Sequence, residues 1–142
     1  MAMPGVPAGG FRTVGQIAPT NDLRFRPDQD CMSVATYLLT THASGGPVID
    51  DAGRYIGFVS EIDLLKALCA GLDLQSIRAE QLMTPCPIGV TEDTPIPAAI
   101  ATMDECHLHV MPVRRADGEV AYSITRHDLL RAWAGLGVGV EE

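Results

Sequence analysis

The chain has 142 residues, enough for one ordinary domain or for two small ones that share a core, and its 46% of apolar residues excludes a disordered chain. A net charge of −8 disfavours binding to nucleic acid and to anionic membrane surfaces. No apolar stretch approaches the roughly 18 residues of a membrane span, and no basic segment precedes an apolar one near the N-terminus. We therefore expect a cytoplasmic protein, with a flexible segment at 1–11 and a loose tail at 136–142.

The first half predicts a strand, a helix, two more strands and a second helix. Residues 23–26 alternate apolar and polar side chains, as a half-buried strand does. Gly53 closes a DDAG sequence and supplies the positive φ that a tight turn needs. The expected elements are a strand at 23–26, a helix at 27–41, a strand at 47–49, a turn at 50–53, a strand after it and a helix at 60–72. A linker is expected at 73–78.

The second half predicts the same order of elements. Thr94 is expected to cap a helix whose first residue is Pro95, since proline suits that position. Gly135 is expected to stop the last helix. The expected elements are a strand at 88–91, a helix from 95 to about 105, a strand at 111–113, a turn at 115–118 with Gly118, a strand after it and a helix from 125 to about 134.

The similarity of the halves is a sequence repeat. A shift of 65 residues aligns residues 14–68 with residues 79–133 without a gap. Identities include Asp28/Asp93, His42/His107, Pro47/Pro112, Val48/Val113, Gly53/Gly118, Asp63/Asp128, Leu64/Leu129 and Leu65/Leu130. The halves read GFVSEIDLL from Gly57 and YSITRHDLL from Tyr122, so each has a strand that runs into S/T-x-x-D-L-L.

Two β-α-β-β-α halves with a repeated P-V strand, a glycine turn and S/T-x-x-D-L-L resemble the tandem CBS domain, or Bateman module. The resemblance covers roughly residues 12–134 and implies an α/β (α+β) fold in which two repeats, 12–72 and 79–135, pack with pseudo-two-fold symmetry. It also implies a homodimer stacked through its helices, with residues 96–103 and 64–72 as candidate contact surfaces.

The resemblance implies an adenosine-containing ligand, such as AMP, ADP, ATP, S-adenosylmethionine or NAD, in clefts between the repeats. One cleft would use Ala18, Pro19, Asn21, Leu23, Ala43 and Ser44 with Thr125 and Asp128. The other would use Met83, Thr84, Cys86, Ile88, Leu108 and His109 with Ser60 and Asp63. Arg126 would add positive charge near a phosphate, as would His109. The second cleft is preferred. The strand before Thr125, in the first cleft, has Tyr122 where the strand before Ser60 has Gly57, and the segment before the first P-V strand reads SGGP where the family has an apolar stretch.

The residue types fit this chemistry, although each motif has a simpler interpretation. An ionised aspartate offers two acceptor oxygens to the two donors of a ribose cis-diol, and exposed N–H groups where a strand meets a helix suit a phosphate. The same S/T-x-x-D sequence can be only a helix capping box. The alternatives are therefore ribose binding and capping.

The sequence gives little support for a metal site or for a catalytic nucleophile. The cysteines Cys31, Cys69, Cys86 and Cys106 match neither metal-ligand pairs nor a disulfide framework, so free thiols are expected. His107 and His109 are expected to alternate along a strand near Cys106, but no further ligand lies at a suitable spacing. There is no G-x-S-x-G elbow.

We therefore expect a regulatory CBS pair that is not an enzyme, needs no obligatory cofactor, senses an adenosine ligand and signals to an effector protein. The alternative is a ligand-free dimerisation or interaction scaffold. The sequence leaves open which ligand binds, whether one or both clefts are occupied, and which partner is regulated.

Overall fold

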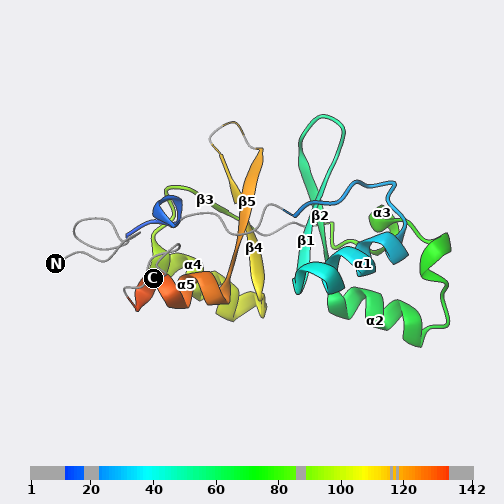
Figure 1. Cartoon of the computed structure of the whole chain (residues 1–142). Helices are drawn as coiled ribbons and strands as arrows, with labels where there is room; N and C mark the ends of the chain where they lie inside the picture. The colour runs from blue at the N-terminus through cyan, green and yellow to red at the C-terminus, as the bar shows by residue number, and fades with distance from the viewer. Residues whose placement is uncertain (1–11, 18–22, 86–88, 116, 118, 135–142) are drawn as a thin grey trace. The chain divides into compact units, whose positions relative to one another are not determined.

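A computed structural model describes residues 12–17, 23–85, 89–115, 117 and 119–134 (Figure 1). It divides into two compact units. Unit 1 comprises residues 1–22, 89–117 and 121–142, and unit 2 comprises residues 23–88 with 118–120. Each described part is considered within its own unit.

Unit 2 holds a two-stranded antiparallel sheet with two helices beside it (Figure 1). Its elements are α1 (Cys31–Thr41), β1 (Gly45–Ile49), β2 (Tyr55–Ser60), α2 (Glu61–Cys69), the 3-10 turn η2 (Leu74–Ser76) and α3 (Ala79–Leu82). Alternate residues of β2 are buried, and Val59 packs with Phe25, Val34, Leu38 and Val48. Burial of such side chains contributes roughly 1.5–3 kcal/mol each.

Unit 1 holds a three-stranded sheet in the order β3-β4-β5. Its elements are η1 (Val14–Gln16), β3 (Val90–Thr91), α4 (Ile96–Cys106), β4 (Val110–Arg114), β5 (Val120–Thr125), whose first residue belongs to unit 2, and α5 (Arg126–Trp133). β3 runs parallel to β4, with Val90 opposite Val113. The core combines β4 and β5 residues with Val14 and Ile17, which precede the first repeat's strands in the sequence.

The first predicted strand and helix both need correction. Residues 23–26 do not form a strand; Phe25 makes a single parallel bridge with Val48. The helix predicted at 27–41 begins only at Cys31. The reason is Asp30, whose Oδ2 accepts a hydrogen bond from Ser33 N at 2.9 Å and so caps the helix at that point.

The start of α4 also differs from the prediction. Pro95, with φ −62° and ψ 143°, is the N-cap residue, and the helix begins at Ile96. Thr94 does not cap it: its Oγ1 accepts a hydrogen bond from Thr91 N at 3.1 Å in the preceding turn. Pro97 instead lies in the first turn, where the missing N–H leaves no helical hydrogen bond unmade.

Short helical segments were not predicted. Val14–Gln16 and Ala79–Leu82 are helical at aligned positions of the repeat, and Leu74–Ser76 forms a 3-10 turn inside the expected linker. Both Leu74 and Ala79 are buried in the core of unit 2. α2 ends at Cys69, three residues before the predicted end, and Gly71 follows with φ +81°.

His107 and His109 do not alternate along a strand. His107 ends α4 in the left-handed conformation, with φ 56°, and His42 ends α1 with the same φ. His109 lies just before β4. The predicted turn glycine Gly53 is confirmed by its φ of +82°, whereas Gly118 lies outside the described residues.

Two further expectations concern thiols and membranes. Cys31, Cys69 and Cys106 are free, and Cys86 lies outside the described residues. In the described ranges no helix reaches the length and hydropathy that a bilayer crossing requires.

Candidate functional site

The first S/T-x-x-D motif lies where β2 passes into α2. Ser60 is the last residue of β2, pairs with Gly45 of β1 and has the extended conformation of an N-cap residue. Glu61 N donates to Ser44 O at 2.9 Å, which fixes the start of α2 against the segment before β1. Asp63 Oδ2 accepts hydrogen bonds from Ser60 N at 2.8 Å and from Ser60 Oγ at 3.0 Å. The predicted motif therefore does organise a helix start.

The second motif lies in the same way where β5 passes into α5. Arg126 N donates to His109 O at 3.1 Å, the counterpart of the Glu61 to Ser44 bond. Thr125 N donates to Asp128 Oδ2 at 2.9 Å, and Asp128 N donates to Thr125 Oγ1 at 3.1 Å. These two reciprocal bonds form a capping box.

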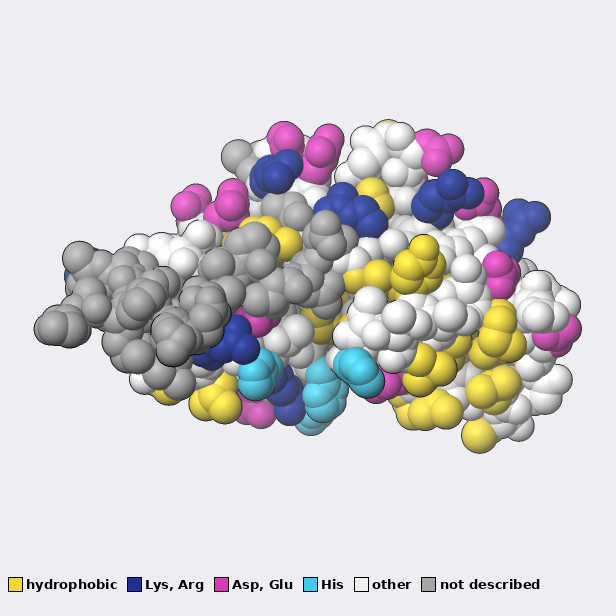
Figure 2. All heavy atoms as spheres, viewed as in Figure 1, with side chains coloured by type: hydrophobic (Ala, Val, Ile, Leu, Met, Phe, Trp, Pro, Cys, Tyr) yellow, Lys and Arg dark blue, Asp and Glu magenta, His cyan; other side chains and the backbone are white. Residues whose placement is uncertain are grey.

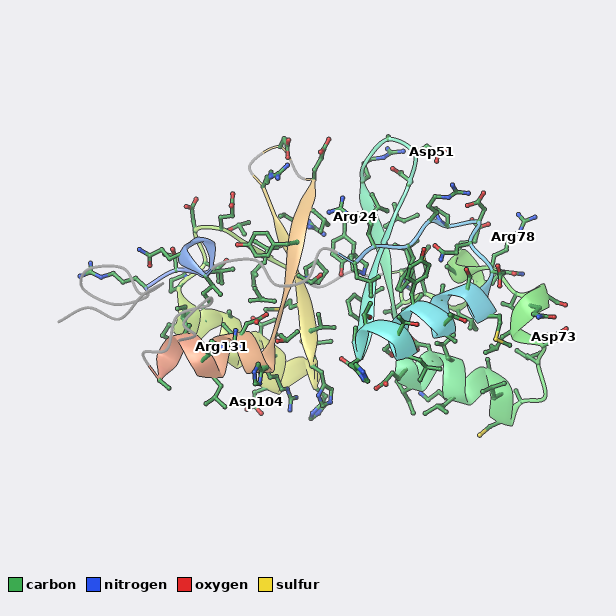
Figure 3. The ribbon with its side chains drawn as sticks, in the orientation of Figure 1. Arg24, Asp51, Asp73, Arg78, Asp104 and Arg131 are labelled. Carbon is green, nitrogen blue, oxygen red and sulfur yellow. The ribbon has the colours of Figure 1, made fainter. Side chains whose placement is uncertain are left out.

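The two carboxylates differ beyond this shared capping. Asp128 is only 3% exposed, and its Oδ1 lies 3.9 Å from Nη1 of Arg131, three residues further along the chain. Arg131 lies on α5 (Figure 3). Asp63 is partly exposed, and Lys66 at the corresponding position makes no ion pair within the described ranges. Its Oδ1 likewise accepts no hydrogen bond from any residue that the structure describes. Asp63 thus has an oxygen that no described residue uses, on a partly exposed side chain, whereas the Asp128 carboxylate is buried beside a cation.

The strand positions before the motifs also differ. A side chain on Gly57 would overlap the side chain of Met83, which packs over the glycine. Thr84, the next residue, pairs with Phe58 through Thr84 N to Phe58 O at 2.8 Å and Phe58 N to Thr84 O at 3.2 Å. The structure therefore brings Met83 and Thr84 to the strand that leads into Ser60 and Asp63.

Tyr122, which the repeat aligns with Gly57, lies in the core of unit 1. It is 7% exposed, and its hydroxyl donates to Val14 O at 3.4 Å. Burial raises the pKa of this phenol, and the nearby Glu92 carboxylate raises it further. The Tyr122 ring therefore fills core space on the strand that leads to Thr125.

The remaining predicted site residues have simpler surroundings. Leu23 and Ala43 pack against the core of unit 2, and Leu108 against that of unit 1. Arg126 is exposed, and its Nε donates to Leu108 O at 2.7 Å. Ala18, Pro19, Asn21, Cys86 and Ile88 lie outside the described residues. Because each predicted cleft draws on both units, the clefts themselves stay predictions.

Two features of the site were not predicted from the sequence. The Asp128–Arg131 ion pair has the i, i+3 spacing that brings side chains together on a helix, and this spacing was a usable signal. The close packing of Met83 on Gly57 joins residues 26 positions apart. The glycine alone, inside a strand, was the available hint of a close approach.

Comparison with known proteins identifies the family. The CBS domain family model matches residues 14–70 and again residues 79–135. The chain is a member of the CBS domain family. The expected α/β fold of two CBS repeats is thereby confirmed, with the first strand reduced to one bridge.

Individual relatives agree with this assignment. The chain is 28% identical to the crystal structure of CBSX2 from Arabidopsis thaliana, with a TM-score of 0.76 over 88% of this chain and 95% of that one. A crystal structure of CBSX2 in complex with AMP is 29% identical, with a TM-score of 0.73 over 87% of this chain and 97% of that one. An uncharacterized 17.7 kDa protein of Acidianus ambivalens is 29% identical and covers 84% of this chain and 71% of its own length.

The two CBS matches do not coincide with the two units. The first match begins at residue 14, yet residues 14–17 belong to unit 1 and supply Val14 and Ile17 to its core. The second begins at residue 79, yet residues 79–85 belong to unit 2, where Ala79 is fully buried. Each CBS repeat thus contributes its leading segment to the unit that holds the other repeat's helices.

The helices of both CBS repeats present apolar surface. In unit 1, α4 and α5 line a groove of about 520 Å³ with Pro97, Ile100, Ala101, Met103, Leu129 and Leu130. In unit 2, hydrophobic side chains gather over α1 and α2 (Figure 2). Those of α2 and the residues after it are Ile62, Leu65, Leu68 and Leu72, each roughly half exposed. Ile96, Ala99 and Met103, inside one predicted contact range, are buried in the core of their own unit.

Proposed function

We propose that this CBS pair is a cytoplasmic regulatory module that binds an adenosine-containing ligand and signals to a partner protein. The observation that carries the proposal is the AMP complex of CBSX2, a structure 29% identical over 87% of the chain. The S/T-x-x-D motif supports it chemically, because an aspartate at a strand-to-helix junction can accept both hydroxyls of a ribose. The proposal includes no catalytic step and no obligatory cofactor.

The proposed ligand class is AMP, ADP or ATP, with S-adenosylmethionine and NAD as alternatives that share the adenosine group. The proposed contacts are those predicted from the sequence, with Ser60, Asp63, Met83 and Thr84 described together in unit 2. Leu108 and His109 are the other described residues among the proposed contacts.

Calorimetric titration of nucleotide-stripped protein tests the proposal. AMP, ADP, ATP, S-adenosylmethionine and NAD are titrated separately, and at least one is expected to bind. Guanosine monophosphate serves as the matched control for base recognition. Absence of binding by all five adenosine ligands would contradict the proposal.

Signalling requires that the ligand bind two states of the protein with different affinity. The proposed output is a change in a homodimer or in a complex with an effector protein. The half-exposed Ile62, Leu65, Leu68 and Leu72 support an interface on α2, since contiguous exposed apolar surface commonly marks an interaction site. Sedimentation of the wild type and of Leu65→Asp tests this: the wild type is expected to dimerise and the variant to be monomeric.

A second candidate is a scaffold that binds no nucleotide. The capping bonds at Ser60 and Thr125 favour it, because they give both motifs a structural role without any ligand. Dimerisation without nucleotide binding in the titration above would support the scaffold. Nucleotide binding at micromolar concentration would exclude it.

A further inference from the structure

The two aspartates of the repeat differ in how many of their acceptor sites the protein itself uses. At Asp128, Oδ2 accepts the Thr125 N–H and Oδ1 faces the Arg131 guanidinium at 3.9 Å. The side chain is 3% exposed. A ribose at this carboxylate would have to enter a nearly buried site and would compete for Oδ1 with the Arg131 guanidinium, which is 28% exposed. Weakening a partly buried ion pair is costly because the buried charge left behind stays desolvated.

Only one oxygen of the Asp63 carboxylate, Oδ2, accepts hydrogen bonds from described residues. Ser60 donates both of its hydrogen bonds to Oδ2, at 2.8 and 3.0 Å. Oδ1 accepts no hydrogen bond from a described residue, and the side chain is partly exposed. A ribose hydroxyl can therefore add to Oδ1 without displacing any protein contact. The Ser60 bonds meanwhile hold the carboxylate in one orientation, which lowers the entropy lost on binding.

The strands that precede the two motifs also differ in the size of one side chain. Gly57 leaves room for Met83, a residue of the predicted adenine segment, to lie directly over β2. Tyr122 instead fills the corresponding position of β5 with a ring buried in the core of unit 1. The repeat aligns Met83 with Ala18 and Gly57 with Tyr122. One half therefore pairs a small strand residue with a large residue at position 83, and the other pairs a large strand residue with a small residue at position 18. Met83 thus lies against the strand that leads into the first motif, whereas the Tyr122 ring fills the corresponding position of the strand that leads into the second.

We infer that the two symmetric motifs have different roles, with Asp63 binding the ribose of one ligand per chain and Asp128 serving only as a helix cap. The inference rests on the proposed function, since it divides the proposed ribose binding between the two repeats. It predicts an asymmetric module in which the second repeat supplies stability and the first supplies the acceptor for the diol.

Calorimetry with AMP as the probe tests the stoichiometry on the full chain. One AMP per chain is expected, and two equivalents per chain would overturn the inference while leaving the proposed function intact. Absence of binding by every adenosine ligand would overturn the proposed function and the inference with it. The wild-type stoichiometry needs no variant, so it decides even if a variant fails to fold.

Substitutions then assign the site. Asp63→Asn is expected to raise the Kd for AMP about tenfold or more, because a charged acceptor is lost. The preference of the wild type for AMP over 2′-deoxy-AMP should shrink in the same variant. Asp128→Asn is expected to lower the melting temperature and to keep the AMP affinity within about twofold. Asp30→Asn, which alters the cap of α1, is the matched control for capping.

The opposite pattern would overturn the inference. This pattern is a tenfold loss of AMP affinity in Asp128→Asn at an unchanged melting temperature, with Asp63→Asn binding normally. An equal loss in both variants would also overturn it, because two equivalent ribose sites would then exist.

Discussion

The starts of α2 and α5 have the same sequence motif and the same backbone path but use their carboxylates differently. Asp63 shares one oxygen with Ser60 and remains partly exposed, whereas Asp128 is buried and faces both Thr125 and Arg131. A repeat therefore preserves local folding more strictly than it preserves chemistry. Capping requires only one carboxylate oxygen, so the second oxygen is free to acquire different partners in each copy.

The largest expected effect comes from Tyr122, which distinguishes the second strand from the first. Tyr122→Ala should lower the free energy of unfolding by about 3–5 kcal/mol, since it leaves a cavity in the core of unit 1. Tyr122→Phe removes only the long hydrogen bond to Val14 O and should cost less than about 1 kcal/mol. Urea denaturation measures both. Equal effects would show that the hydroxyl, and not the ring, stabilises the strand.

A smaller effect is expected at Gly57, the counterpart of Tyr122. Gly57→Ala should destabilise by about 1–3 kcal/mol, because the new methyl group overlaps Met83. The double variant Gly57→Ala with Met83→Ala should be less destabilised than the sum of the two single variants, as a double-mutant cycle can measure. Strict additivity would contradict the proposed packing of Met83 on β2.

Removing the capping aspartate should destabilise the protein more at the second motif than at the first. Asp128→Ala should cost about 1–2 kcal/mol, since it removes a capping box and leaves Arg131 unpaired. Asp63→Ala should cost about 1 kcal/mol or less, because Asp63 is more exposed and has no ion pair within the described ranges. Thermal unfolding of the two variants ranks them. A larger loss in Asp63→Ala would reverse the comparison.

The smallest effect concerns a feature in which the repeats agree. His42 and His107 each end a helix with φ 56°, a conformation that costs an L-residue about 1 kcal/mol and that glycine adopts readily. His42→Gly and His107→Gly should therefore each raise the free energy of unfolding by up to about 1 kcal/mol. Destabilisation in either variant would show that the imidazole makes a contact that outweighs the strain.

The sequence was sufficient for the fold and for the starts of α2 and α5, because both depend on local signals that occur twice. The S/T-x-x-D motifs lie at helix N-termini as predicted, and Gly53 closes its turn with a positive φ. The start of α1 was misplaced because Asp30 competes with Pro27 as a start signal, and the hydrogen bond to Ser33 decides between them.

The site was less predictable, because its differences arise from neighbours distant in sequence. Val14 belongs to the core beside Tyr122, and Met83 packs on Gly57, although neither pair is close along the chain. Periodicity places each of these residues on an element but does not show which unit will bury it. The sequence favoured the cleft with Asp63, but the burial of Asp128 and its ion pair with Arg131 became visible only in the three-dimensional arrangement.

A crystal structure of the full chain grown with AMP tests the division of roles most directly. We predict one AMP per chain, with its ribose hydroxyls within hydrogen-bond distance of Asp63 and with Asp128 still bonded to Thr125 and beside Arg131. A ribose on Asp128, with the Arg131 pair broken and Asp63 free of ligand, would contradict the account.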